Sequence, residues 1–210
     1  MYLAKTPWIV KKLYSNYVWN MNKNDKIIYL TFDDGPHPTI TNFVLDILKK
    51  HNAKASFFCI GKNVELYFDV YKRIINEGHT VGNHTQNHLK GWQTKDEIYL
   101  KDIEQAATNI DSKLFRPPYG RITKFQSSLL IEQGYKVIMW DVLSGDFDIN
   151  LSKEKCAENV LLNATNGSII VFHDSEKAKE RIEYALPKVL EYFSNLGYEF
   201  KNLNLAELNN

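Results

Sequence analysis

The sequence predicts an α/β fold, and more specifically a small β/α barrel. Apolar runs rich in β-branched and aromatic residues alternate along the chain with segments of helical periodicity. Strands that alternate with helices indicate a mostly parallel sheet. Six or seven such units in 210 residues favour a small barrel over an open sheet. Because no repeat, low-complexity stretch or linker divides the chain, we expect a single domain.

The first half of the chain predicts three strands and three helices. The apolar run 27–32 has the composition of a strand buried on both faces. Residues 64–76 place their apolar side chains on one helical face, and Gly78 supplies a stop. The predicted strands are residues 27–32, 55–60 and 80–81, and the predicted helices are residues 42–50, 64–76 and 95–110.

The second half continues the alternation. Residues 135–142 form its clearest strand pattern, and Pro187 predicts a kink or a fresh start within the last helix. The other predicted strands are residues 113–115, 168–172 and 198–203, and the predicted helices are residues 124–133, 154–164 and 182–196.

Residues 1–24 precede the first strand as an aromatic-rich extension. Thr6 is a plausible N-cap, followed by Pro7 at the first helical position. The expected helix then includes Trp8 and continues toward Trp19. We expect it to pack over the barrel, and an aromatic surface for sugar contacts or an interface is the alternative.

Composition excludes several classes of protein. With 26 Lys+Arg against 25 Asp+Glu, the net charge is +1, which argues against nonspecific nucleic-acid binding but not against a neutral ligand such as a sugar. Cys59 and Cys156 are too few for a disulfide scaffold, so we expect free structural thiols. We expect no transmembrane segment and, as a default, a monomer. The N-terminus lacks the apolar stretch of a secretory signal, which favours a cytoplasmic location, with a periplasmic or cell-envelope one as the alternative.

Polar clusters follow five of the predicted strands, at residues 31–36, 84–88, 116–120, 144–147 and 173–174. In β/α barrels the carboxyl ends of the strands share one face, where active sites are built. Each cluster also has an ordinary interpretation, such as a turn, surface charges or a structural ion pair. Taken together, we expect them to converge on one site.

One of these clusters contains two histidines, His84 and His88, which share a face if their segment is helical. Adding Asp34 gives two imidazoles and one carboxylate. Three protein ligands with an open position are typical of catalytic zinc or a related divalent ion. The alternative is that both histidines are ordinary surface residues.

The order of the clusters resembles the polysaccharide deacetylase family, a NodB-homology domain of carbohydrate esterase type. The resemblance rests on TFDDGP at 31–36, HTQNH at 84–88, RPPYG at 116–120 and IIVFHD at 169–174, and it runs from about residue 26 to about residue 201. It implies a distorted (β/α) barrel in a single domain of seven or eight β/α units. Residues 25–205 would then be the catalytic domain, with residues 1–24 as its N-terminal extension.

The resemblance also implies roles for individual residues. Asp34, His84 and His88 would bind the metal. Asp33 would be the general base that takes a proton from metal-bound water, and Arg116 would hold it ionised and oriented.

The remaining implied roles concern the oxyanion and the leaving group. The backbone N–H of Tyr119 would help to stabilise the oxyanion. His173 would be the general acid, with Asp146 as its partner. Leu143 stands where the family often has Asp. The residues expected to line the substrate pocket are Pro117, Trp140, Phe147 and Val171.

The implied activity is metal-dependent hydrolysis of acetyl groups from N-acetylated sugars of a polysaccharide or oligosaccharide. Zinc is the expected ion, with cobalt, manganese or nickel as alternatives. An O-acetyl esterase on the same fold and an inactive carbohydrate-binding descendant are the alternative functions. The sequence does not discriminate among peptidoglycan, chitin-like oligomers and a soluble or lipid-linked acetylated sugar.

Overall fold

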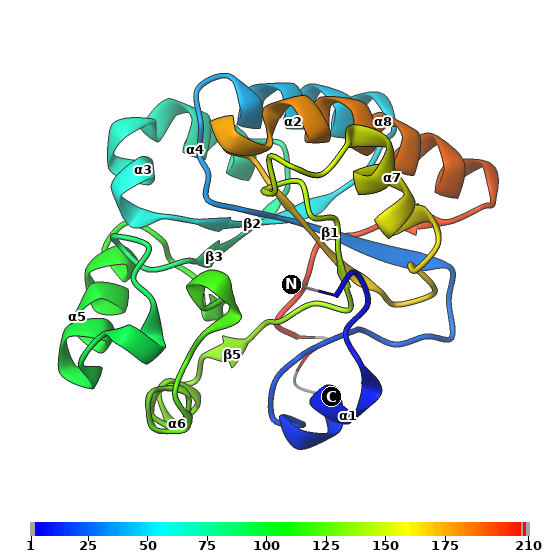
Figure 1. The fold of residues 1–210 in the computed structure, drawn as a ribbon. Coiled ribbons are helices and arrows are strands. Elements are labelled where there is room, and N and C mark those ends of the chain that lie inside the picture. The colour runs from blue at the N-terminus through cyan, green and yellow to red at the C-terminus, as the bar shows by residue number, and fades with distance from the viewer. Residues whose placement is uncertain (1–2, 207, 209–210) are drawn as a thin grey trace.

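The computed structural model describes residues 3–206 and 208, and these form a curled sheet of parallel strands wrapped by helices (Figure 1). The strand order is β5-β4-β3-β2-β1-β7-β6, with β8 beside the start of β1. This arrangement confirms the predicted single α/β domain with a distorted barrel. The strands are β1 (Ile27–Asp33), β2 (Ala55–Cys59), β3 (Thr80–Asn83), β4 (Leu114–Phe115), β5 (Lys136–Val137), β6 (Val142–Leu143), β7 (Ile169–His173) and β8 (Glu199–Phe200).

Helices lie outside the curled sheet, and the largest apolar cluster fills the space between them. Leu30 and Phe32 of β1 are fully buried there, as are apolar side chains of the long last helix. That helix continues through Pro187. The helices are α1 (Trp8–Leu13), α2 (Ile40–Lys50), α3 (Gly61–Leu66), α4 (Phe68–Asn76), α5 (Asp96–Ala107), α6 (Lys124–Glu132), α7 (Lys153–Leu161) and α8 (Lys179–Asn195), with 3₁₀ turns η1 (Gly91–Gln93), η2 (Pro118–Gly120) and η3 (Glu176–Ala178).

The prediction of one helix over 64–76 is wrong, because the chain breaks at Tyr67 between α3 and α4. The first N–H groups of α3 donate to the carbonyls of Thr85 and Gln86, in the loop after β3. Its Asn63 side chain donates to the carbonyl of Asp34 (2.7 Å). These contacts fix α3 against two loops of the site, whereas α4 packs against β3.

The predicted strand 135–142 is also interrupted, because its backbone changes partners along the run. Ile138 N–H donates to Phe115 O on β4, Met139 N–H donates to Val18 O, and Asp141 N–H donates to Ile169 O on β7. The apolar pattern predicted burial, but it contained no signal for this bend.

The N-terminal segment lies between β5 and β6, the two ends of the strand order, rather than only covering the barrel. Val18 forms a parallel bridge with Ile138, Asn20 an antiparallel bridge with Ser168, and Lys5 an antiparallel bridge with Val142. The helix within it is shorter than expected. Thr6 is not its cap, because the Thr6 hydroxyl donates to the carbonyl of Trp140 (2.8 Å).

Both cysteines are buried and free, as predicted. Among the described residues, we find no helix with the length and apolar character needed to cross a bilayer.

Candidate active site

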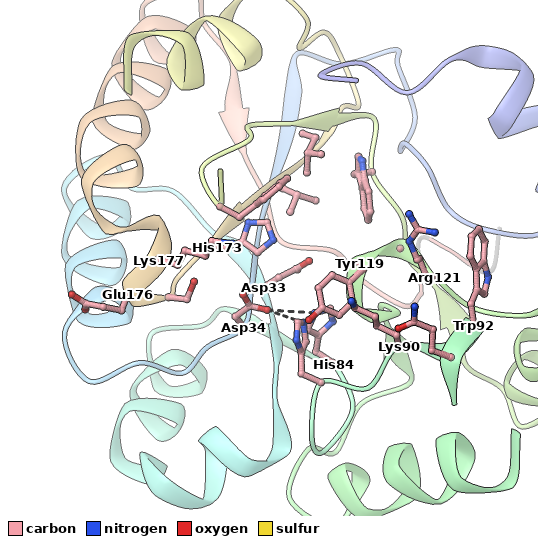
Figure 2. A pocket seen from close by; sticks show the side chains of 18 residues that line it. Asp33, Asp34, His84, Lys90, Trp92, Tyr119, Arg121, His173, Glu176 and Lys177 are labelled. Carbon is pink, nitrogen blue, oxygen red and sulfur yellow. Dashed lines mark ion pairs between the residues drawn. The ribbon is translucent and has the colours of Figure 1, made fainter. Parts of the chain in front are cut away.

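The carboxyl ends of the strands open into one cavity of about 890 Å³ (Figure 2). β1 supplies Asp33, and β7 supplies His173. The register of the two strands pairs these residues side by side. The cavity is lined by Asp33, Asp34, His84, His88, Lys90, Trp92, Gln93, Tyr119, Gly120, Arg121, Trp140, Leu143, Phe147, Val171, His173, Ser175, Glu176 and Lys177.

Arg116 is fully buried beneath the cavity and holds Asp33. Its Nη1 donates to Asp33 Oδ1 (2.7 Å) and to the hydroxyl of Thr31 (2.7 Å). The buried guanidinium thus compensates a carboxylate that is only 4% exposed.

The other two nitrogens of Arg116 also have acceptors. Nε donates to the carbonyl of Ile138 (3.1 Å) and Nη2 to that of Met139 (3.0 Å). These two carbonyls belong to the bend between β5 and β6, so the interrupted strand supplies the arginine with acceptors. The guanidinium also lies over the ring of Phe58, 4.1 Å from its centroid.

Asp34 turns away from Asp33 because its backbone has a φ of 80°. The next residue, Gly35, donates its N–H to Oδ1 of the buried Asp174 (3.1 Å). A Cβ at Gly35 would lie 2.1 Å from an Asp174 oxygen, so only glycine allows this approach. Burial raises the pKa of Asp174 to about 7. Thr41 also donates to this carboxylate.

Asp34 faces His84 and His88. Its Oδ1 lies 3.7 Å from His84 Nε2 and 3.2 Å from His88 Nε2. Burial opposes ionisation of Asp34, but His88, His173 and His84 hold its pKa well below the usual range. The segment from His84 to His88 is a loop, with a φ of 66° at Thr85 and 57° at His88. The condition for a shared helical face is therefore not met, yet the two side chains still converge on Asp34.

These three side chains can hold a divalent cation. One ligand atom from each lies within 4.8 Å of the others. Asp34 Oδ1 is buried and has no hydrogen-bond partner, which is the condition of a ligand atom that awaits a cation. His84 Nδ1 donates to Arg116 O (2.8 Å), which leaves its Nε2 lone pair facing the cluster. Burial also lowers the pKa of His84 to about 4, so the imidazole is neutral.

His173 is held across the cavity by Asp146. The Asp146 carboxylate accepts from His173 Nδ1 (2.7 Å) through Oδ1 and from the His173 backbone N–H (2.6 Å) through Oδ2. Burial alone would lower the pKa of His173, but Asp146 raises it to about 10. The imidazole therefore carries a proton at neutral pH, with Nε2 left for the cavity.

Comparisons with known proteins show the family to which the chain belongs. The sequence pattern of the family described as polysaccharide deacetylase matches residues 20–138. The chain belongs to the polysaccharide deacetylase family. A peptidoglycan-N-acetylglucosamine deacetylase of Bacillus cereus is 36% identical over 188 residues, which cover 87% of this chain and 88% of that protein.

Two further relatives extend the comparison. The peptidoglycan-N-acetylmuramic acid deacetylase PdaC of Bacillus subtilis is 31% identical over 89% of this chain, which spans 40% of that longer protein. The crystal structure of a peptidoglycan N-acetylglucosamine deacetylase in complex with 4-naphthalen-1-yl-N-oxidanyl-benzamide has a TM-score of 0.83. The two chains are 31% identical, and the match covers 94% of this chain and 95% of the chain in that structure. This deacetylase fold therefore extends over nearly the whole chain.

Most of the predicted site residues lie in or against the cavity. Trp140, Phe147 and Val171 line it. The Phe147 ring meets His173 edge-on at 5.2 Å. Pro117 does not line the cavity; it is buried, and its carbonyl accepts the Gly120 N–H.

Sequence reasoning missed the loops that support and flank the site. Asp102 on α5 accepts the backbone N–H groups of Gln86 (2.9 Å) and Asn87 (3.0 Å), in the loop between the histidines. Lys90, Trp92 and Arg121 line one wall of the cavity. Trp92, four residues after HTQNH, was a signal in the sequence for that wall.

Proposed function

We propose that this protein is a metal-dependent hydrolase that removes acetyl groups from N-acetylated sugars of a polysaccharide or oligosaccharide. One observation carries the proposal. A carboxylate and an imidazole, each fixed by a buried partner, lie around the three side chains that can hold a cation. Asp33 on Arg116 and His173 on Asp146 open onto the same cavity as Asp34, His84 and His88.

In this proposal, Asp34, His84 and His88 hold the divalent cation, with zinc as the expected ion. When bound, the cation supplies Lewis acidity toward the acetyl carbonyl and toward water. Asp33 accepts a proton from the attacking water, and Arg116 holds the carboxylate in position by donating to its Oδ1.

The second proton transfer falls to His173. Its imidazolium donates from Nε2 to the sugar nitrogen as the carbon–nitrogen bond breaks, and acetate and the free amine leave. An amine leaves only when it is protonated, so an imidazolium that persists at neutral pH favours an amide substrate. The backbone N–H of Tyr119, whose φ is 59°, is assigned to the developing oxyanion.

Acetate release from a panel of N-acetylated and O-acetylated glycans tests the proposal. We expect release from N-acetyl glycans that stops with a chelator and returns with added zinc. Faster release from the O-acetyl members would favour the esterase. No release from any member, with metal restored, would favour an inactive carbohydrate-binding protein.

Asp33→Asn tests the assigned roles of the two adjacent carboxylates. We expect turnover to fall by about 10²- to 10⁴-fold while bound zinc per chain stays at the wild-type level. Asp34→Asn is the matched variant and should lose the zinc. Because Asp33→Asn leaves the Arg116 charge uncompensated, circular dichroism must first show a folded protein. Loss of zinc from folded Asp33→Asn would mean that the two roles are misassigned.

A further inference from the structure

One wall of the cavity carries two cations and an exposed indole that the mechanism does not use. Lys90 and Trp92 come from the loop after β3, and Arg121 comes from the loop after β4. Figure 2 shows these side chains together, on the opposite side of the site from Glu176 and Lys177. Since an acetyl group needs only a small part of about 890 Å³, this wall is available to the rest of the substrate.

The wall is held in place by contacts between its two loops. Trp92 Nε1 donates to the carbonyl of Ile122 (2.8 Å), and Gly91 N–H donates to the carbonyl of Arg121 (3.1 Å). A Cβ at Gly91 would lie 2.7 Å from that carbonyl oxygen, so the close approach requires glycine. The indole is nevertheless 58% exposed. A fixed, exposed aromatic face in a cavity is suited to stacking against a sugar ring.

Ring contacts connect this wall to His88, one of the three side chains that can hold a cation. The rings of His88 and Tyr119 lie 4.7 Å apart. Lys90 Nζ lies 4.6 Å from the Tyr119 ring centroid. Arg121 lies over the Trp92 ring, 4.7 Å from its centroid. Lys90 is therefore joined to His88 through the Tyr119 ring, and Arg121 and Trp92 line the cavity beside it.

The positive charge of the wall is not neutralised locally. Within the described part of the chain, neither Lys90 nor Arg121 forms an ion pair with a carboxylate. The acid that lines the cavity farther out, Glu176, lies 3.7 Å from Nε2 of His37 and belongs to the opposite wall. Because the whole chain carries only +1, this charge is a local feature of the wall.

We propose that Lys90, Trp92 and Arg121 form a subsite for a sugar that bears a carboxylate and adjoins the sugar being deacetylated. The inference rests on the proposed function and narrows its substrate to acidic N-acetylated glycans. The indole receives the apolar face of the ring. The guanidinium and the ammonium bind the carboxylate, for which both have the matching charge and donors.

Binding of three tetrasaccharides measures whether the protein prefers a glycan that carries carboxylates. The first alternates N-acetylglucosamine with N-acetylmuramic acid, the second is the same compound with methyl-esterified carboxylates, and the third contains N-acetylglucosamine alone. Calorimetry with the zinc-loaded protein should give the tightest binding for the first, and the difference should shrink at high salt. Lys90→Gln and Arg121→Gln should each weaken binding of the acidic compound by about threefold, the range of an exposed ion pair, and leave the ester unaffected.

Two further variants separate selectivity for the carboxylate from effects on the binding of any of the three glycans. Lys72→Gln is the matched control, because Lys72 lies over an exposed ring, that of Phe68 (4.8 Å), outside the cavity. It should bind all three compounds as the wild type does. Trp92→Ala should weaken all three to a similar degree.

The outcomes distinguish this inference from the proposed function. Equal affinity for the acidic compound and its ester, or a preference that survives both charge substitutions, would overturn the subsite. Tight, carboxylate-dependent binding without acetate release would support the subsite and contradict the hydrolase. Acetate release without carboxylate selectivity would do the reverse.

Discussion

Asp33 and Asp34 are neighbours in the chain, yet their side chains have different partners. Asp33 ends a strand and lies on the buried Arg116. Asp34 has a φ of 80°, which redirects its carboxylate toward two histidines. A single backbone conformation thus separates a group suited to proton transfer from one suited to holding a cation. The sequence predicted both candidates, with a turn at residues 33–36 as the ordinary interpretation, but it did not predict the positive φ of Asp34 or the packing of Gly35 against Asp174.

The pair formed by Asp146 and His173 predicts how activity depends on pH. Because Asp146 raises the pKa of His173 to about 10, the contact contributes its full stability below about pH 6.5. That contribution is lost as the pH rises through about 10. The alkaline limb of kcat/KM should therefore lie well above pH 7, although a bound cation, by repelling the imidazolium, moves it below 10.

Asp146→Asn tests this dependence. The substitution removes the negative charge that raises the pKa of His173, and the lowering effect of burial remains. The pKa of His173 should therefore fall below its ordinary value of about 6.5, and the alkaline limb of kcat/KM should move to lower pH with it. The measurements are kcat/KM against pH and the NMR titration of the His173 ring. An unchanged alkaline limb in folded Asp146→Asn, or unaltered turnover in His173→Ala, would contradict the assignment of His173 as the acid.

The strands and the loops of the site differ in how far the sequence predicts them. β1 and β7 are continuous apolar runs, so their ends, at Asp33 and His173, could be placed from the pattern alone. The HTQNH segment has no such periodicity. Its shape comes from long-range contacts, in which α3 donates to its carbonyls and Asp102 accepts its N–H groups. The spacing of the two histidines alone therefore could not predict how their side chains converge on Asp34.

Asp102 is accordingly expected to act on zinc affinity rather than on the chemical step. Its Oδ1 accepts from Asn87 Nδ2 (2.6 Å), and its Oδ2 accepts two backbone N–H groups. Asp102→Asn loses one acceptor and the charge, which should loosen the loop that holds His84 and His88. We expect zinc affinity to fall by about 10- to 100-fold, as for other residues that orient metal ligands.

A zinc titration with a competing chelator measures that affinity, and kcat at saturating zinc measures the chemical step. Glu104→Gln, at an exposed position on the same helix, is the control and should change neither quantity. Zinc affinity at the wild-type level in Asp102→Asn would show that the loop keeps its shape without this carboxylate.

The N-terminal segment, residues 1–24, joins the two ends of the curled sheet. Residues 1–24 carry aromatic side chains but no strand pattern, so the expectation was a helix covering the barrel. In the structure, single bridges at Lys5, Val18 and Asn20 join this segment to the two ends of the curled sheet. Isolated bridges leave no periodicity to detect, and their partners lie more than 100 residues away.

Asp141 binds the N-terminal segment to the barrel through polar contacts. We therefore expect this carboxylate to stabilise the fold. The carboxylate binds Lys5 Nζ (2.7 Å) and Lys11 from the N-terminal segment and accepts from the Ser168 hydroxyl (2.5 Å). Burial opposes ionisation, but these donors hold the pKa of Asp141 below its ordinary value. A lowered carboxyl pKa contributes stability above the unfolded-state value of about 3.9, and that stability is lost as the pH falls through the folded-state value.

Asp141→Asn should therefore lower the free energy of unfolding by about 1.5–3 kcal/mol at pH 7, the range for hydrogen bonds to charged groups. The difference from the wild type should shrink as the pH is lowered from about 4 toward the lower folded-state pKa of Asp141, because the unfolded carboxyl takes up its proton first. Urea denaturation at pH 7 and pH 3 measures both values, with Asp25→Asn, at an exposed position, as the control. A deficit of the same size at both pH values would mean that Asp141 acts through packing rather than charge. A loss of cooperativity in Asp141→Asn, seen as a lower denaturant slope, would instead show that the N-terminal segment unfolds separately from the barrel that it completes.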